Sequence, residues 1–141
     1  MSSYLSSQNI WRSLVATLRA DATLKAALTG GIHEALAPEA VAYPHLVWTP
    51  AVTGVNEDDW SGRMILALAD VVIVSRSSVE ASNLDQSVIP LLDEVGIAVT
   101  GHTTLICHRV GDIRFPDFDE EGRKIYRVGG SYEIVTDQLS S

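Results

Sequence analysis

The chain has 141 residues, a length that one domain normally occupies. Its formal net charge is −8 and it has no run of Lys or Arg, which argues against tight binding to nucleic-acid phosphates. The most apolar run, residues 64–74, is too short for a membrane-spanning helix and contains Asp70. We expect one domain over residues 1–141, with flexible tails at 1–9 and 137–141.

Cysteine usage and the N-terminal segment indicate where the protein is made. Cys107 is the only cysteine, so an internal disulfide cannot form and nothing indicates an oxidising compartment. The first nine residues, MSSYLSSQN, lack the basic region and the apolar core of a signal peptide. We therefore expect a soluble protein that is made in a cytoplasm, without membrane association.

The first part of the chain predicts helices followed by a short strand. Apolar residues recur every four positions from Ile10 to Leu18, which indicates one apolar stripe along a helix. Asp21 is placed to cap a second helical segment, and the glycine pair at 30–31 to end it. Apolar and polar residues alternate over 32–36, which predicts a short strand.

Two further strands are predicted before the middle of the chain. Pro44 fixes its own φ and favours extended backbone before it, so it bars a helix and starts the strand at 45–55. Pro50 cannot donate to a ladder, which places it at an edge or a bulge. After a turn at 56–62, the nearly continuous apolar run at 63–75 predicts a long central strand.

A helix is predicted after this long strand. Ser77 and Glu80 have the S-x-x-E spacing of a capping box, and an apolar helical stripe follows from Leu84. Pro90 lies within that stripe and is expected to kink the helix or to weaken its last turns. Gly96 is expected to end the helix.

Two strands, at 103–115 and 125–135, are predicted at the end of the chain, joined by an acidic loop at 116–124. The glycine pair at 129–130 indicates a bulge or a close backbone approach. The order of elements predicts an α+β fold, in which a mainly antiparallel sheet of four to five strands carries an N-terminal helical segment and a second helix on one face.

The four histidines form no recognisable catalytic or metal-binding motif, because no pair has H-x-x-x-H or H-E-x-x-H spacing. His108 follows Cys107, but neighbours on a strand point to opposite faces, and we expect a buried, structural cysteine. His45 has no partner at a recognisable spacing, so we interpret Tyr43-Pro44-His45 as the entry to a strand. No metal, cofactor or catalytic residue is predicted.

Two acidic loops, each with one aromatic residue, are the remaining candidates for a binding surface. A solvated loop at a strand end is the simplest interpretation. Trp60 and Phe118 favour a docking surface instead, because exposed aromatic side chains often anchor a partner, although they could equally fold back over the core. The candidates for a subunit interface, a tube interface or a lumen are Glu57, Asp58, Asp59, Trp60, Asp117, Phe118, Asp119, Glu120 and Glu121.

The order of these features resembles the tail-completion or tail-terminator proteins of long-tailed, siphovirus-like bacteriophages, prophages and gene-transfer particles. The resemblance covers residues 11–135 and rests on three segments. They are LRADATLKAALTGGIHEALAPEAVAYPHLVW, with its aromatic-Pro pair before an apolar strand; VVIVSRSS, followed by an A-x-x-L-x-x-x-V helix; and two C-terminal strands with an Asp-rich connection. Pro90 and His45 depart from the usual pattern.

The resemblance implies a structural protein and no enzyme. Such subunits form a ring, commonly a hexamer, that caps the tail tube, ends its polymerisation and offers a surface for joining the head. The implied partners are further copies of the chain, the tail tube protein and the head-completion or connector protein. The implied location is the tail neck of the virion, reached after assembly in the host cytoplasm. DNA would pass through the lumen without specific binding, and we expect acidic residues of one loop to line it.

Three other functions stay open at this point. Another ring of the neck, a stopper or an adaptor, would bind on the portal side. A small enzyme using His45 or His108 would need a pocket that places the histidine beside a carboxylate or a hydroxyl group. A monomeric binding module would be a single species with the mass of one chain.

Overall fold

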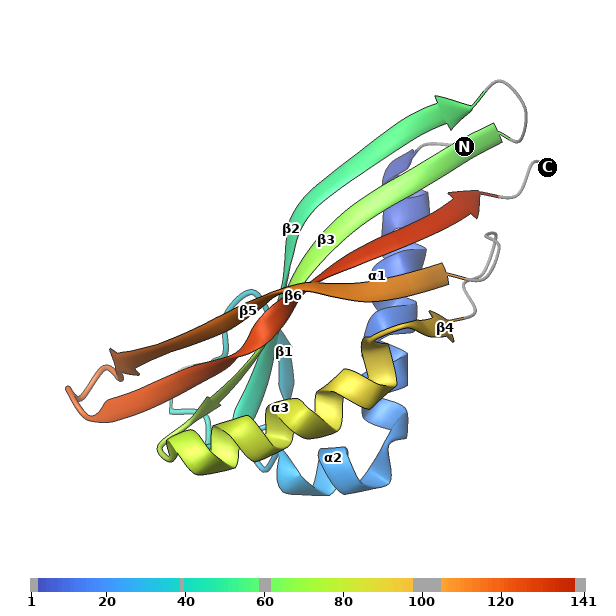
Figure 1. Ribbon diagram of the computed structural model, residues 1–141. Coiled ribbons are helices and arrows are strands. Elements are labelled where there is room, and N and C mark those ends of the chain that lie inside the picture. Colours follow the sequence, from blue (N-terminus) through green and yellow to red (C-terminus); the bar gives the residue numbers. More distant parts are fainter. Residues whose placement is uncertain (1–2, 39, 59–61, 98–104, 139–141) are drawn as a thin grey trace.

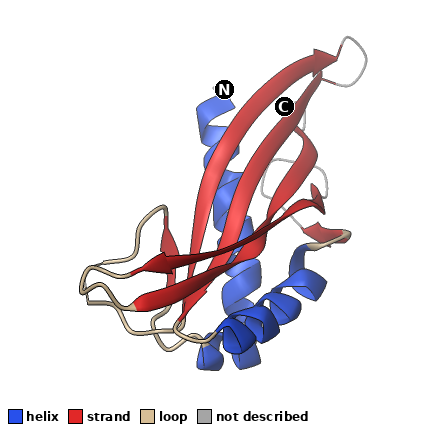
Figure 2. Cartoon of the chain, turned by 60° about the vertical axis from the view of Figure 1, so that its left-hand side comes forward, coloured by secondary structure: helices blue, strands red, loops and turns tan. Residues whose placement is uncertain are grey.

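The computed structural model describes residues 3–38, 40–58, 62–97 and 105–138. Three helices, α1 (Ser3–Ala20), α2 (Ala22–Ala27) and α3 (Ser78–Leu92), pack on one face of a six-stranded sheet (Figures 1 and 2). The strands are β1 (Ile32–Glu34), β2 (His45–Asp58), β3 (Gly62–Ser75), β4 (Val95–Ile97), β5 (Leu105–Phe118) and β6 (Lys124–Gln138). The sheet has the order β1-β2-β3-β6-β5-β4 and curves into a half-barrel.

The N-terminal helices confirm the predicted stripe and cap. Ile10 and Leu18 are fully buried, and Leu14 is nearly so, which places this face of α1 in the core. Asp21 Oδ1 accepts a hydrogen bond of 2.8 Å from the Leu24 amide, so the side chain satisfies one of the free amides at the start of α2. α1 begins at Ser3 and therefore includes most of the segment 1–9 that we expected to be a tail.

The predicted sheet of four to five mainly antiparallel strands is wrong, because the sheet is mixed and has six strands. β1 pairs parallel with β2, with Ile32 opposite Leu46, since the loop over 35–44 returns the chain to the same end of the sheet. β4 is a sixth strand, antiparallel to β5. Its three residues are too few to show a periodicity, and the prediction had assigned Val95 and Gly96 to the end of a helix.

α3 ends earlier than predicted, well before Gly96. Its last residue is Leu92, and Glu94, with φ of 58°, turns the chain into β4, so Gly96 does not end the helix. Pro90 lies inside the last turn, where Asp93 still donates a 2.8 Å hydrogen bond to the Ile89 carbonyl. The helix thus accommodates its proline close to its end, where few further backbone hydrogen bonds remain to be lost.

The predicted cap by Ser77 at the start of α3 is confirmed, but the reciprocal bond of a capping box is replaced by bonds through Ser75. Ser77 Oγ accepts from the Glu80 amide at 3.2 Å. The Glu80 carboxylate does not reach back to the Ser77 amide; it accepts from Ser75 Oγ at 2.7 Å, and that hydroxyl in turn accepts from the Ser77 amide at 3.1 Å. Ser75 therefore connects the end of β3 to the first turn of the helix.

The prediction that residues 63–75 form a long central strand is confirmed. β3 pairs with β2 on one side and with β6 on the other. Val71 and Ile73 join the main core under the helices, whereas Val74 packs on the opposite face with Val47, partly covered by Tyr43. β2 carries a register shift between Pro50 and Val52, so the proline lies at the predicted bulge.

The two long hairpins leave strand edges open at opposite sides of the sheet. β1 covers only residues 46–48 of β2, and β4 covers only residues 105–107 of β5. In the part of the chain that the structure describes, the remaining outer edges of β2 and β5 have no strand beside them. The β2–β3 and β5–β6 hairpins extend in different directions from the body of the molecule (Figure 1).

The β5–β6 ladder is irregular beside a glycine pair, and Arg109 lies at this irregularity. β5 has a register shift between Arg109 and Gly111, next to the stretch that pairs with Gly129 and Gly130. The Arg109 guanidinium lies over Gly130, where a Cβ atom would approach it to 2.6 Å. Gly129 approaches the backbone of β3 so closely that a Cβ atom would overlap the Val71 carbonyl oxygen. The predicted close approach at residues 129–130 is therefore confirmed.

Arg109 is mostly buried, and each of its three guanidinium nitrogens donates a hydrogen bond to an oxygen. It makes two hydrogen bonds of 2.9 Å to the carboxylate oxygens of Asp85 on α3, and one of 2.6 Å to the Gly129 carbonyl. Nη1 also donates to Tyr132 Oη at 3.1 Å, and Nε to Asp112 at 2.9 Å. These bonds, that to Asp85 above all, raise the pKa of Arg109 above its ordinary value.

We predict that Gly129→Ala destabilises the fold by about 3 kcal/mol, because β3 cannot move away without breaking its own ladders. Gly111→Ala is the matched control, since a Cβ atom there meets nothing within 4 Å. Urea unfolding followed by circular dichroism measures both. A Gly129→Ala protein as stable as the Gly111→Ala protein would contradict the close packing of β3 and β6.

Candidate interaction surfaces

Residues 117–123 form the tip of the β5–β6 hairpin, and the side chain of Asp119 organises its turn. Asp119 Oδ1 accepts hydrogen bonds from the amides of Glu121, at 3.0 Å, and Arg123, at 2.8 Å. These bonds, with that to the Arg123 amide contributing most, hold the pKa of Asp119 below its ordinary value. Gly122 has φ of 78°, a conformation that glycine adopts without strain. The tip is therefore a defined turn.

Most of the predicted carboxylates on this tip are paired with arginines. Asp117 accepts from Arg127 Nε at 2.8 Å, which lowers the pKa of Asp117 from its ordinary value. Arg123 contacts both Asp119, at 3.3 Å, and Glu121, at 2.6 Å. Among the ion pairs between described side chains, none involves Glu120. Glu120 is therefore the carboxylate of the tip that is available to a partner.

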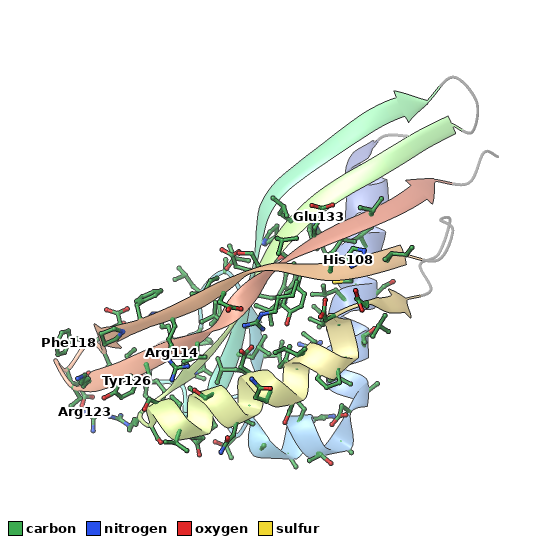
Figure 3. The ribbon with its side chains drawn as sticks, viewed as in Figure 1. His108, Arg114, Phe118, Arg123, Tyr126 and Glu133 are labelled. Atoms are coloured by element: carbon green, nitrogen blue, oxygen red, sulfur yellow. The ribbon has the colours of Figure 1, made fainter. Side chains whose placement is uncertain are left out.

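Phe118 is the predicted anchor that the structure leaves exposed. Its side chain is 66% exposed at the end of β5, and Figure 3 shows it at the free end of the hairpin together with Arg123. Three more large apolar residues are exposed along the same strand, namely Ile106, Val110 and Phe115. Exposed apolar area concentrated on a strand with one largely open edge is typical of an interface between proteins.

A cavity of about 740 Å³ lies between this hairpin and the loop over residues 35–44. Its cationic residues are engaged inside the molecule. Arg76 lies 4.7 Å from the Tyr43 ring centroid and 3.6 Å from Asp119, and Arg127 pairs with Asp117. The cavity therefore offers a mixed, largely neutralised lining, which does not favour an anionic small molecule.

His45 lines this cavity but is held as part of the fold. It is 5% exposed, and its Nδ1 lies 3.1 Å from the Ala42 carbonyl, to which the neutral ring donates. Burial, followed by repulsion from His33 and Arg127, lowers the pKa of His45 below its ordinary value despite the bond to Ala42. Tyr43 is its aromatic neighbour at 5.2 Å between ring centroids. The strand begins at His45, as predicted from the preceding proline.

Cys107 and His108 point to opposite faces of β5, as predicted. Cys107 is fully buried in the core under the helices, and burial raises the pKa of its thiol to about 12. His108 is exposed on the other face, and its backbone partner across the ladder is Glu133 (Figure 3). A thiol with this pKa is almost entirely protonated at neutral pH and is a poor nucleophile.

A groove of about 580 Å³ on the other side of the molecule was not predicted. α1 and the edge strand β1 form its walls, and its floor contains Trp11 and Trp48, whose ring centroids are 5.8 Å apart. Arg12 and Arg19 flank it from α1, and Glu34 lines it from β1. The two tryptophans are 37 positions apart in the sequence, so no local pattern predicts their pairing.

The other predicted acidic loop, over residues 56–62, belongs only in part to the described residues. Glu57 and Asp58 end β2, whereas Asp59 and Trp60 lie outside the described residues. The structure thus brings Asp117, Phe118, Asp119, Glu120 and Glu121 together at one tip. The role of these five residues in an interface or a lumen stays a prediction, as does that of the other four candidates. Among the described residues no group of three or more His, Cys, Asp or Glu side chains could hold a metal ion, and no helix is long and apolar enough to cross a membrane.

Comparisons with known proteins extend this description. No protein-family model matches the sequence, and a search of curated proteins finds no match. Among solved structures, a chain of the virion of a native gene transfer agent particle superimposes with a TM-score of 0.68 at 15% identity, over 89% of this chain and 92% of that chain. A second solved chain has a TM-score of 0.58 at 13% identity, over 100% and 99% of the two chains. These likenesses establish a shared fold.

We predict that His45 makes stability depend on pH. Because its pKa is lowered on folding, the unfolded chain binds more protons below about pH 6.5, and the free energy of unfolding falls as the pH drops through that value towards the folded pKa. His45→Gln, which keeps a donor for Ala42, should reduce the difference between urea midpoints at pH 7.5 and pH 5.5. The exposed His108→Gln is the control, and an unchanged difference in His45→Gln would contradict the prediction.

Proposed function

We propose that this chain is a structural subunit of a phage-like virion and, within that class, a tail terminator. In this role it forms a ring, commonly of six subunits, which caps the tail tube, stops its polymerisation and offers a surface for joining the head. The observation that carries the proposal is the common fold with a chain of a gene transfer agent virion over nearly the whole of both chains. The sequence resemblance to tail-terminator proteins points independently to the same class.

The arrangement of the sheet supports a ring. The open edge of β2 and that of β5 lie at opposite sides of the sheet, so a contact between copies can join two different surfaces. Contacts of this heterologous kind close into a ring when the rotation between subunits permits it. The exposed apolar side chains of β5 give such a contact an area from which water can be excluded.

The chemistry of the described site supports a binding role over an enzymatic one. His45 donates to a backbone carbonyl within the fold, and the arginines beside it are paired with carboxylates. Cys107 is buried with a raised pKa. The proposed activity is therefore assembly, with the tail tube protein and a head-completion or connector protein as further partners in the tail neck.

The net charge of −8 fits a ring through which DNA moves, because negative walls weaken adhesion to phosphates. We propose that acidic residues of one loop line the bore. The candidates are Glu57, Asp58 and Asp59, because the tip of the β5–β6 hairpin is proposed for the contact between subunits. Imaging of the assembled ring tests this feature. A bore lined by Lys and Arg would contradict it, while leaving the capping role in place.

We predict that particles assembled without this protein have overlong tails or tails that are not joined to heads. The reason is that tube polymerisation then lacks its cap and the head lacks its docking surface. Electron microscopy of particles from a deletion strain, with the wild-type chain restored on a plasmid as the control, measures both features. Tails of normal length joined to heads would reject the terminator role. Tails of normal length beside heads that lack the joint on their portal side would favour a stopper.

A further inference from the structure

The Trp11–Trp48 groove has an aromatic floor, two arginines along α1 and the carboxylate of Glu34 on the β1 side. Trp11 is half-buried and Trp48 is 6% exposed, so only part of the aromatic floor meets solvent. Arg12 and Arg19 are seven residues apart on α1, two helical turns, and are both exposed at the same side of the groove. Among the ion pairs between described side chains, none involves either arginine.

The tip of the β5–β6 hairpin has the complementary character. Phe118 presents an exposed aromatic ring, and Glu120 presents an unpaired carboxylate two residues further on. The turn between them is fixed by the hydrogen bonds of Asp119, so little conformational entropy is lost when the tip docks. An aromatic anchor with an adjacent carboxylate fits an aromatic floor when the carboxylate lies on the α1 side, where the two arginines are, and away from Glu34.

The tip cannot reach the groove of its own chain. In Figure 1 the hairpin ends on one side of the molecule and α1 stands on the other. The groove adjoins β1, at one end of the strand order, whereas the hairpin is formed by β5 and β6 near the other end. A contact between the two features must therefore join two copies, and the pair then keeps one free groove on one copy and one free tip on the other.

We propose that Phe118 of one copy inserts into the Trp11–Trp48 groove of the next copy, with Glu120 facing Arg12 and Arg19. The contact is heterologous and repeats around the ring, so this inference rests on the proposed function and names its subunit interface. The second copy is favoured over other occupants because the complementary charge and the exposed ring are both present in this chain.

Cross-linking tests the contact directly. Ala16 is exposed in the groove wall and Glu120 is exposed at the tip, so the double variant Ala16→Cys/Glu120→Cys places one thiol on each surface. Oxidation of this protein at high concentration should give a ladder of covalent oligomers on a denaturing gel. Each single variant should run as a monomer on this gel. The buried Cys107 thiol, with its pKa of about 12, does not compete for oxidation. A double variant without a ladder would overturn the proposal.

A mixing experiment separates this contact from any symmetric one. Phe118→Ala lacks the anchor but keeps the groove, whereas Arg12→Glu/Arg19→Glu keeps the anchor and repels the tip. Each variant alone should assemble at least tenfold more weakly than the wild type, which corresponds to the loss of a single interface anchor. An equimolar mixture should form heterodimers and no larger species, because each pair then has one intact contact. Val79→Ala, equally exposed at 68%, is the control for Phe118→Ala.

The outcomes distinguish this inference from the proposed function. If Phe118→Ala and Arg12→Glu/Arg19→Glu each form oligomers of wild-type mass in native mass spectrometry, the contact is rejected. A terminator ring that closes through another interface would still be compatible with that result. Normal tails in the deletion strain together with a full cross-linked ladder would reject the terminator role and retain the contact. Rescue of Arg12→Glu/Arg19→Glu by Glu120→Lys in the same chain would support the charge pairing.

Discussion

The pairing of Arg109 with Asp85 is the interaction on which the rest of the structure depends. A guanidinium that is mostly buried is tolerated only when its donors are satisfied, and here they reach α3, the β6 backbone and the Tyr132 hydroxyl together. The glycines at 129–130 leave the space in which it lies. One side chain therefore joins the helical layer to the irregular part of the β5–β6 ladder.

This connection lies at the base of the hairpin that carries one of the surfaces proposed for assembly. Beyond Arg109, β5 and β6 continue past the helices to the turn organised by Asp119 (Figure 1). Phe118 is exposed because the hairpin extends that far, and the groove at Trp11 stays open because β1 is only three residues long. A long strand pair at one side and a short edge strand at the other thus provide the two unlike surfaces that the proposed ring requires.

The sequence predicted those elements whose signals lie within a few residues. The caps at Asp21 and Ser77 are examples, because each bonds an amide three positions away. It failed for pairings that depend on distant segments. The parallel β1 and the three-residue β4 leave no local pattern, and Arg109 is 24 positions from Asp85. The glycine pair of β6 was the one local sign of that site. For the candidate surface, the sequence identified the acidic tip and its phenylalanine, whereas the groove required two distant tryptophans.

The central claim is that the Asp85–Arg109 pair holds the β5–β6 hairpin in its direction. Hydrogen exchange of the Asp85→Ala protein, measured by mass spectrometry against the wild type, tests it most directly. The account predicts faster exchange over residues 109–118 and 123–131, with the β2–β3 ladder still protected, because the freed guanidinium no longer joins α3 to β6. Unchanged protection in the hairpin, or equal loss in every strand, would contradict it.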